Sequence, residues 1–371
     1  MQPSTLAVPG VQTLTPYIPG KPIGELEREL GLRHIVKLAS NENPLGPSPL
    51  ALEAAARVLP ELHLYPDGGG FELKATLART LGVNPEQITL GNGSNDVLEL
   101  VARVFLCGEA SAVFSEHAFA VYPILTQATG ARALVAPAHD GSRGPHHGHN
   151  LEAMTRAIRP DTRVVFIANP NNPTGTYLGK FELENFLRSL PEQVIPVVDE
   201  AYFEYVRKPD YPDALTLLST IPNLIVTRTF SKAYGLAGLR VGYSVSSPAM
   251  ADLLNRVRQP FNVNAPALEA ARAALGDVEH LVRTVRLNDA GLSVLTKALT
   301  QRGLQVIPSV GNFITFDAGQ PSGPVYAALL REGVIVRPIG NYGLPNHLRV
   351  TVGTEDENQA FLGALDRVLM A

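Results

Sequence analysis

Short apolar runs alternate with amphipathic segments through residues 87–226. Between the apolar runs, apolar residues recur with the spacing of one helical face at 95–106, 122–129, 151–158 and 180–190. Strands that are apolar on both faces and alternate with helices are typical of a mainly parallel sheet covered by helices, so we predict an α/β fold. The expected strands are 87–90, 111–114, 133–135, 163–168, 194–198 and 224–226.

A long helix and a smaller unit are predicted after this alternation. Apolar residues between positions 278 and 299 step by three, four or seven, which places them on one helical face. Segments 313–316, 334–337 and 348–352 are expected strands of a smaller α+β unit. The first 45 residues are rich in proline and glycine, with one amphipathic patch at Ile23–Leu30, and are expected to form an arm. The predicted parts are an arm (1–44) packing with the small domain, a large domain (45–265), and a linking helix with a small C-terminal domain (266–371).

Composition and charge narrow the classes of function. The chain has 371 residues, of which 45% are hydrophobic, and a net charge of −4, whereas a chain that neutralises many phosphates needs a basic excess. Nucleic-acid binding is therefore not expected. The single cysteine, Cys107, cannot form an internal disulfide, which fits a reducing setting. The start lacks the features of a signal peptide, and no apolar run reaches about 18 residues, so we expect a soluble cytoplasmic protein and no membrane association.

One polar segment, 140–149, contains three histidines: His146, His147 and His149. Clustered histidines are metal ligands in many proteins. Because the sequence around them shows no further set of ligands, we expect a solvated loop and no metal.

Residues 91–96 (Gly-Asn-Gly-Ser-Asn-Asp) follow a predicted strand and open a predicted helix. The segment is not a dinucleotide-binding fingerprint, because Asp96 stands where the third glycine should be. The free N–H groups and positive dipole end of a helix N-terminus suit a phosphate. A plain turn with a helix cap explains the segment equally well.

Two further polar clusters follow predicted strands. Residues 168–175 (Ala-Asn-Pro-Asn-Asn-Pro-Thr-Gly) offer amide groups at the carboxyl edge of the sheet, where ligands of open α/β sheets bind; alone, they could be an ordinary loop. Asp199 ends a buried strand, where a carboxylate needs a cation or strong donors. It could also be a helix cap.

Lys232 lies in a segment of hydroxyl residues and glycines, 228–240, after the last of these strands. A lysine that is desolvated beside other cations has a lowered pKa and becomes an amine nucleophile able to form a Schiff base. Most lysines are solvated surface charges. Thr229 and Lys232 also match an acyl-transfer spacing, but its partner motifs are missing.

Together, the four clusters resemble the fold-type-I pyridoxal-phosphate-dependent aminotransferases over essentially the whole chain. That resemblance implies a large domain with a mostly parallel mixed sheet flanked by helices, plus a smaller α+β domain. It implies that Lys232 holds pyridoxal phosphate as a Schiff base and later shuttles a proton. Asp199 would pair with the ring nitrogen. Asn172 and Tyr202 would hydrogen-bond the ring's phenolate oxygen.

The resemblance also implies how the rest of the cofactor is held. Phe119 would stack on the ring, and Tyr65 would reach the cofactor phosphate of a partner subunit in a homodimer with shared active sites. The implied phosphate-binding residues are Ser94, Asn95, Thr229, Ser231 and Arg240.

Segments 14–22, 38–46, 334–338 and 348–354 resemble the histidinol-phosphate aminotransferases within that family. The implied reaction exchanges an amino group between L-histidinol phosphate and 2-oxoglutarate, giving imidazole acetol phosphate and glutamate, in histidine biosynthesis. Two arginines and a tyrosyl hydroxyl suit a phosphate dianion. The implied substrate-binding residues are Tyr17, Asn43, Arg337 and Arg349.

Two features depart from the family pattern. His117-Ala118-Phe119 replaces the more usual Pro-Thr-Tyr or Pro-Thr-Phe, and the loop 140–149 is longer than usual. Two alternatives on the same scaffold stay open: an aromatic amino-acid aminotransferase, and a decarboxylase of a phosphorylated amino acid. A nicotinamide-dependent oxidoreductase has little support without the third glycine.

Overall fold

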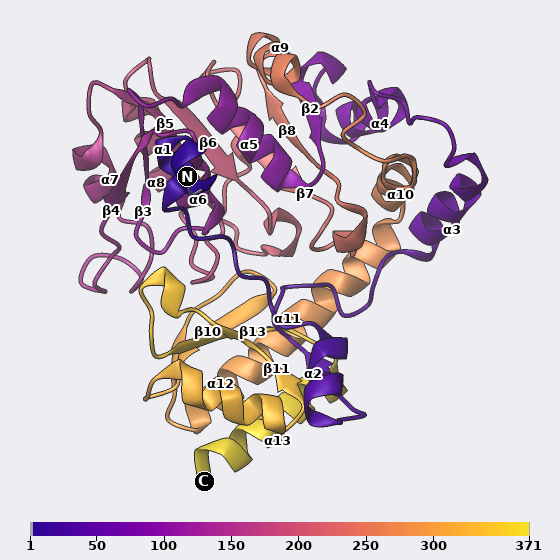
Figure 1. Cartoon of the computed structure of the whole chain (residues 1–371), viewed down its shortest axis with the longest axis vertical. Helices are drawn as coiled ribbons and strands as arrows, with labels where there is room; N and C mark the ends of the chain where they lie inside the picture. Colours follow the sequence, from indigo (N-terminus) through magenta and orange to yellow (C-terminus); the bar gives the residue numbers. More distant parts are fainter. Residues whose placement is uncertain (1–2, 371) are drawn as a thin grey trace.

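The computed structural model describes residues 3–370, which form a larger and a smaller body. The larger body contains a seven-stranded sheet, and the smaller one contains a four-stranded sheet (Figure 1). Helix α11 (Val278–Gln301) reaches from the larger body into the smaller one. No helix in residues 3–370 is long and apolar enough to span a membrane.

The seven-stranded sheet has the order β2-β8-β7-β6-β5-β3-β4. Strand β8 runs antiparallel to both of its neighbours, and the other adjacent pairs are parallel, so the sheet is mixed and mostly parallel as predicted. The six expected strands all form, whereas β8 was not predicted because its serines break the apolar pattern. The strands are β2 (Ile88–Gly91), β3 (Ser111–Ser115), β4 (Arg132–Ala136), β5 (Thr162–Ala168), β6 (Ile195–Asp199), β7 (Ile225–Thr229) and β8 (Gly242–Ser246).

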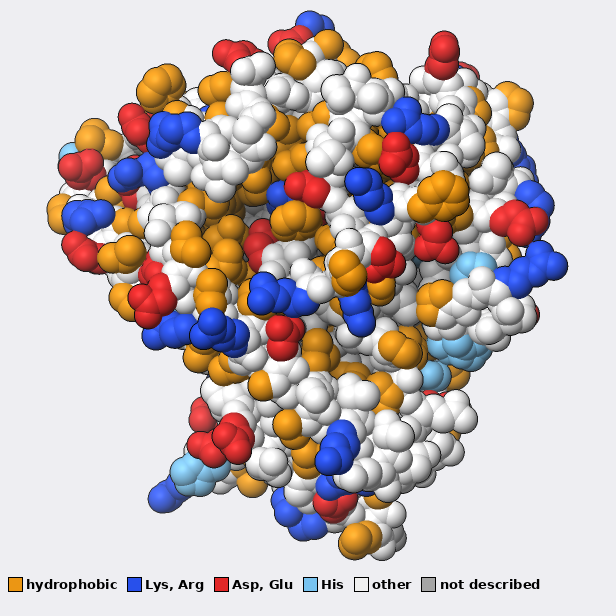
Figure 2. Space-filling view, turned by 180° about the vertical axis from the view of Figure 1, so that it is seen from behind, with side chains coloured by type: hydrophobic (Ala, Val, Ile, Leu, Met, Phe, Trp, Pro, Cys, Tyr) orange, Lys and Arg blue, Asp and Glu red, His pale blue; other side chains and the backbone are white. Residues whose placement is uncertain are grey.

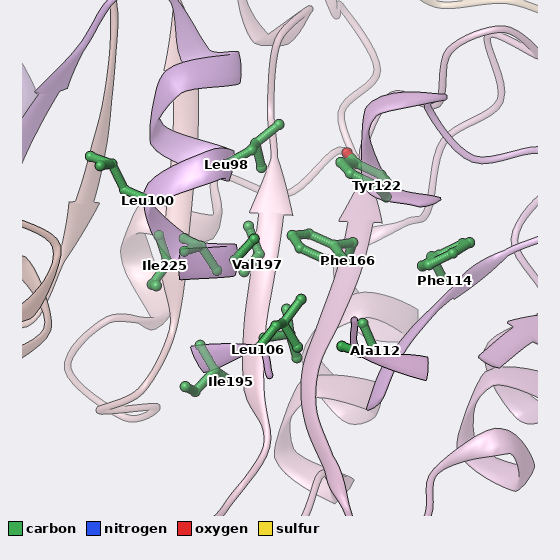
Figure 3. Close-up of a cluster of buried hydrophobic side chains, with 14 of the residues drawn as sticks. Leu98, Leu100, Leu106, Ala112, Phe114, Tyr122, Phe166, Ile195, Val197 and Ile225 are labelled. Atoms are coloured by element: carbon green, nitrogen blue, oxygen red, sulfur yellow. The ribbon is translucent and has the colours of Figure 1, made fainter. Parts of the chain in front are cut away.

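Helices cover both faces of this sheet (Figure 1). Along β5, Val164 and Phe166 belong to the core on one face, shown in Figure 3, and Val165 and Ile167 to the core on the other. Both sets of side chains are therefore buried, which is why the strand reads as a continuous apolar run. The helices of this body are α3 (Pro49–Arg57), α4 (Phe71–Leu81), α5 (Ser94–Phe105), α6 (Val121–Ala128), α7 (Leu151–Ala157), α8 (Lys180–Ser189), α9 (Pro248–Val257) and α10 (Ala265–Gly276).

The smaller body is an antiparallel sheet, β12-β13-β10-β9, packed against helices. Leu295 of α11 and Phe316 of β10 share its core with Phe361. Its elements are β9 (Gln305–Ile307), β10 (Phe313–Asp317), α12 (Ser322–Arg331), β12 (Arg337–Pro338), β13 (His347–Thr351) and α13 (Glu355–Met370).

The prediction of a single strand at 334–337 is wrong. Val334–Ile335 forms β11, which pairs with β1 (Val36–Lys37), while β12 pairs with β13. The chain therefore changes partner after Ile335, and an apolar pattern cannot reveal which strand lies beside it.

The N-terminal segment touches both bodies. Helix α1 (Pro9–Gln12) lies against α6, and Gln127 of α6 donates to Thr13. Helix α2 (Ile23–Leu30) and β1 pack on the smaller body, where Leu26 and Ile335 share a core.

The expected domain boundary after residue 265 separates α10 from the elements it contacts. Helix α10 packs against α3 and α4, and Ala267 and Ala271 share a core with Leu73 and Leu77 of α4. By its packing, α10 belongs with the larger body.

Candidate active site

A cavity of about 580 Å³ opens at the carboxyl ends of β5, β6 and β7. These strands are adjacent and parallel, so the residues that follow them meet at one edge of the sheet. Most of the expected site residues line this cavity. They are Tyr17, Ser94, Asn95, Phe119, Asn172, Asp199, Tyr202, Thr229, Ser231, Lys232, Arg240, Arg337 and Arg349.

Lys232, which is half-buried, presents its amine to the cavity. Its Nζ donates to the carbonyl oxygen of Ser40 at 3.1 Å. Burial, assisted by the positive charges of Arg349 and Arg240, lowers the pKa of Lys232 to about 8. A substantial fraction of the amine is thus neutral and nucleophilic close to neutral pH.

Asp199 carries a buried carboxylate that is held by two hydroxyl groups. Tyr122 donates to its Oδ2 at 2.9 Å, and Thr227 donates to its Oδ1 at 3.0 Å. Burial raises the pKa of Asp199, and the two donors oppose that shift by stabilising the charged form. Tyr122 was not among the expected site residues, because its role depends on a contact across 77 positions in sequence.

Asn41 lines the cavity and was missed, although it lies only two residues before the expected Asn43. Its Nδ2 donates to the hydroxyl of Tyr202 at 2.9 Å, and its backbone has a left-handed φ of 55°, which asparagine tolerates. Burial raises the pKa of Tyr202, so its phenol stays protonated.

Asn43, which was expected to bind substrate, makes hydrogen bonds to other parts of the chain. Asn43 lies outside the cavity lining. Its Nδ2 donates to the carbonyl of Ala233 at 2.9 Å and to Thr284 at 3.1 Å, and its Oδ1 accepts from the backbone of Leu45. These bonds occupy the side-chain amide and connect the N-terminal segment with α11.

Arg349, on β13, brings a buried cation from the smaller body into the cavity. Its guanidinium donates to Oδ1 of Asn172 and, at 2.7 Å, to the carbonyl of Ala39. Only 6% of the residue is exposed, its Nε has no partner, and no acidic side chain in residues 3–370 forms an ion pair with it. Such a cation is a natural site for a substrate anion.

Arg337 and Tyr17 lie together at the same cavity. Arg337 donates to the carbonyl of Ile18 at 2.6 Å, and its guanidinium carbon lies 5.6 Å from the centre of the Tyr17 ring. The N-terminal arm thus places a phenol beside a second cation.

The N-terminus of α5 forms an anion cradle with Arg240. Gly93 precedes the helix, no side chain caps it, and Nη1 of Arg240 donates to Oγ of Ser231 at 3.3 Å. Gly93 has a φ of 83°, and a Cβ there would lie 2.3 Å from Nη2 of Arg240. The cradle therefore depends on glycine.

The donor set fits pyridoxal phosphate. The cradle suits its phosphate, Lys232 its aldehyde and Asp199 a protonated ring nitrogen. Asn172 and Tyr202 can donate to its phenolate oxygen, and Phe119 offers an aromatic face.

Tyr65 does not reach the cavity of its own chain. It is 83% exposed and stacks on Phe261, with ring centres 4.7 Å apart.

The expectation of a solvated histidine loop is wrong for two of its three histidines. His149 is 4% exposed, and its Nε2 donates to the carbonyl of Ala168 at 2.8 Å. His147 turns inward onto His117. Across residues 3–370, no group of three or more histidine, cysteine or acidic side chains is arranged to hold a metal ion.

Comparison with known proteins places this site in context. Residues 33–365 match the family described as aminotransferase class I and II. Histidinol-phosphate aminotransferase 2 of Methylococcus capsulatus is 68% identical, with 100% of each chain covered. The protein of that name from Pseudomonas fluorescens is 60% identical, over 98% of this chain and 97% of the relative. The crystal structure of histidinol-phosphate aminotransferase from Sinorhizobium meliloti in complex with pyridoxal-5'-phosphate is similar with a TM-score of 0.89 and 29% identity, covering 98% of this chain and 97% of that one.

The cradle yields a prediction at Gly93. We expect Gly93→Ala to displace the Arg240 guanidinium and to weaken retention of pyridoxal phosphate by about tenfold, because one charged hydrogen bond to the phosphate is lost. The dissociation constant can be measured from cofactor absorbance during dialysis. Gly238→Ala is the matched control, since a Cβ there meets nothing within 4 Å. Equal retention by both variants would contradict the assignment of the cradle.

Proposed function

Because the chain belongs to the class I and II aminotransferases, we propose that it exchanges an amino group between L-histidinol phosphate and 2-oxoglutarate, a step of histidine biosynthesis. The observation that carries this proposal is 68% identity, over the full length of both chains, to a histidinol-phosphate aminotransferase. That relative favours this substrate over the aromatic and decarboxylase alternatives.

When bound, pyridoxal phosphate supplies an electron sink for the substrate's Cα electrons. Lys232 would hold the cofactor through Nζ and, when this amine is free, would take up the proton that leaves the substrate Cα. Its lowered pKa suits this exchange near neutral pH. Asp199 keeps the ring nitrogen protonated, and Tyr122 and Thr227 hold Asp199 in place.

Arg349 orients Asn172 as well as binding the substrate. Because the guanidinium donates to Oδ1 of Asn172, the amide Nδ2 is left to donate to the phenolate oxygen of the cofactor. Tyr202, which accepts from Asn41, directs its own hydroxyl proton toward that same oxygen.

Arg349 and Arg337 both contribute to the binding of substrate anions. Arg349, with Arg337 and Tyr17 beside it, offers enough donors for the phosphate dianion of histidinol phosphate. Glutamate and 2-oxoglutarate bring a carboxylate to the same place in the alternate half-reaction.

We also propose a cytoplasmic homodimer in which Tyr65 completes the phosphate site of the partner. Tyr65 is exposed and does not line the cavity of its own chain, which supports this arrangement. Within each chain, we propose an arm to residue 44, a large domain that includes α10, and a small domain after it.

Half-transamination tests the proposed function directly. We expect L-histidinol phosphate to convert the absorbance of the bound cofactor to that of the amine form at a higher kcat/KM than phenylalanine. One methylene or ring difference is worth only about 10- to 200-fold, so both amines should be titrated. A preference for phenylalanine would select the aromatic alternative, and release of CO2 without consumption of 2-oxoglutarate would select the decarboxylase.

Arginine variants test how the anions are bound. We expect Arg349→Ala to reduce kcat/KM for histidinol phosphate and for glutamate by about 10- to 100-fold each, since both anions use it. Arg337→Ala should affect histidinol phosphate more than glutamate. The exposed Arg331→Ala is the control for removal of a positive charge from the smaller body. Equal losses for both substrates in Arg337→Ala would remove the phosphate-specific role.

Mixing subunits tests the shared site. Tyr65→Ala and Lys232→Ala chains, each impaired alone, are allowed to exchange. In a mixed dimer, the Tyr65→Ala chain keeps its own Lys232 and receives Tyr65 from its partner, so one complete site returns. We expect activity to recover to that of one wild-type site per dimer. Absence of recovery in proven heterodimers would mean that each chain builds its site alone.

A further inference from the structure

The two departures from the family pattern, His117 and the long loop 140–149, contact each other. Nδ1 of His147 lies 3.3 Å from Nε2 of His117, and the two rings meet edge to face. Figure 2 shows histidine side chains gathered where the two bodies meet, on the right of the view. His149 fixes the end of the loop through its bond to Ala168.

His117 connects the larger body to the smaller one. It is 5% exposed, and its Nδ1 lies 2.7 Å from the carbonyl oxygen of Tyr342. Because a carbonyl only accepts, Nδ1 carries the proton and Nε2 is an acceptor. Nδ1 of His147 is therefore the donor to that Nε2, and it fixes the tautomer that His117 needs. Burial, with the neighbouring His146, His117 and His347, lowers the pKa of His147 to about 4, so it is neutral at physiological pH.

The hydrogen bond between His117 and Tyr342 joins two segments that contribute residues to the site. Tyr342 lies in η7 (Gly340–Tyr342), which connects the strand of Arg337 with the strand of Arg349. On the other side, the backbone carbonyl of His117 accepts from Nδ2 of Asn171 at 3.0 Å, next to Asn172.

The same stretch of chain places Phe119 in the cavity and Ala120 against the smaller body. Ala120 packs on Ile339, Tyr342 and Leu344. The proline that is usual at position 117 has no side-chain donor for this bond.

We propose that His117 is a positioning residue that fixes the two substrate arginines relative to the cofactor-binding residues, with His147 holding it in the required tautomer. The proposal rests on the proposed function in that Arg337 and Arg349 bind the substrate anions. Lys232, Asp199 and Arg240 lie on the larger body, so these cofactor contacts do not depend on the side-chain bond from His117 to Tyr342. His117 holds Asn171 through its backbone carbonyl, which a substitution of the side chain leaves in place.

The test compares His117→Leu with His117→Asn in the cofactor-loaded enzyme. Leucine removes the donor and leaves the Tyr342 carbonyl without a partner, whereas the amide nitrogen of asparagine occupies nearly the position of Nδ1. We expect His117→Leu to raise KM for both histidinol phosphate and glutamate by roughly tenfold with a smaller change in kcat. Amide hydrogen exchange at 339–344 should accelerate while retention of pyridoxal phosphate stays unchanged. His117→Asn should restore both KM and exchange to within about threefold of wild type.

Loop variants provide the second comparison. His147→Leu should reproduce part of the rise in KM, and the exposed His146→Leu should leave KM unchanged. An unchanged KM in His117→Leu, with only a lower melting temperature, would overturn the proposal. The proposal would also be overturned if His117→Asn were impaired to the same extent as His117→Leu. If the wild-type enzyme does not react with histidinol phosphate, the proposed function is wrong. KM for glutamate and amide exchange at 339–344 then still test the positioning role of His117.

Discussion

A buried guanidinium without an acidic partner is the constraint on which this site depends. Within residues 3–370, Arg349 is held only by neutral oxygens of Asn172 and Ala39. Removing such a cation from water costs several kcal/mol unless an anion compensates it. Together with burial, which is the larger cause, its charge lowers the pKa of Lys232. Its hydrogen bond orients Asn172. The binding of the substrate anion, the orientation of Asn172 and the pKa of Lys232 therefore all depend on the side chain of Arg349. When the substrate binds, its anion supplies the negative charge that Arg349 lacks.

The fold explains how this cation meets the rest of the chemistry. Parallel β5, β6 and β7 end at one edge of the sheet, so the loop of Asn172, the carboxylate of Asp199 and the amine of Lys232 are delivered by the larger body. The cations for substrate come from the smaller body, on β12 and β13. Binding geometry thus depends on how the two bodies are held together, which gives the His117–Tyr342 hydrogen bond its importance.

The sequence predicted most of the fold because strands buried on both faces leave continuous apolar runs. It missed β8, whose buried serines break that pattern, and it joined β11 to β12, which pair with different strands. Residues embedded in local motifs, such as Lys232 and Asp199, were expected in the site, and they line the cavity. Asn41, Tyr122 and His149 act through partners distant in sequence, so local pattern could not reveal them. For the same reason, local pattern did not reveal that the amide of Asn43 bonds to Ala233 and Thr284.

Burial and the neighbouring arginines prepare Lys232 as the reactive amine. The most direct measurement is the rate at which cofactor-free protein reacts with pyridoxal phosphate as a function of pH, followed by borohydride reduction and peptide mapping. Since only the neutral amine reacts, the rate should rise with pH through a midpoint near 8, with the label on Lys232. A midpoint near the ordinary lysine value of 10.5, or a label on another lysine, would contradict the account.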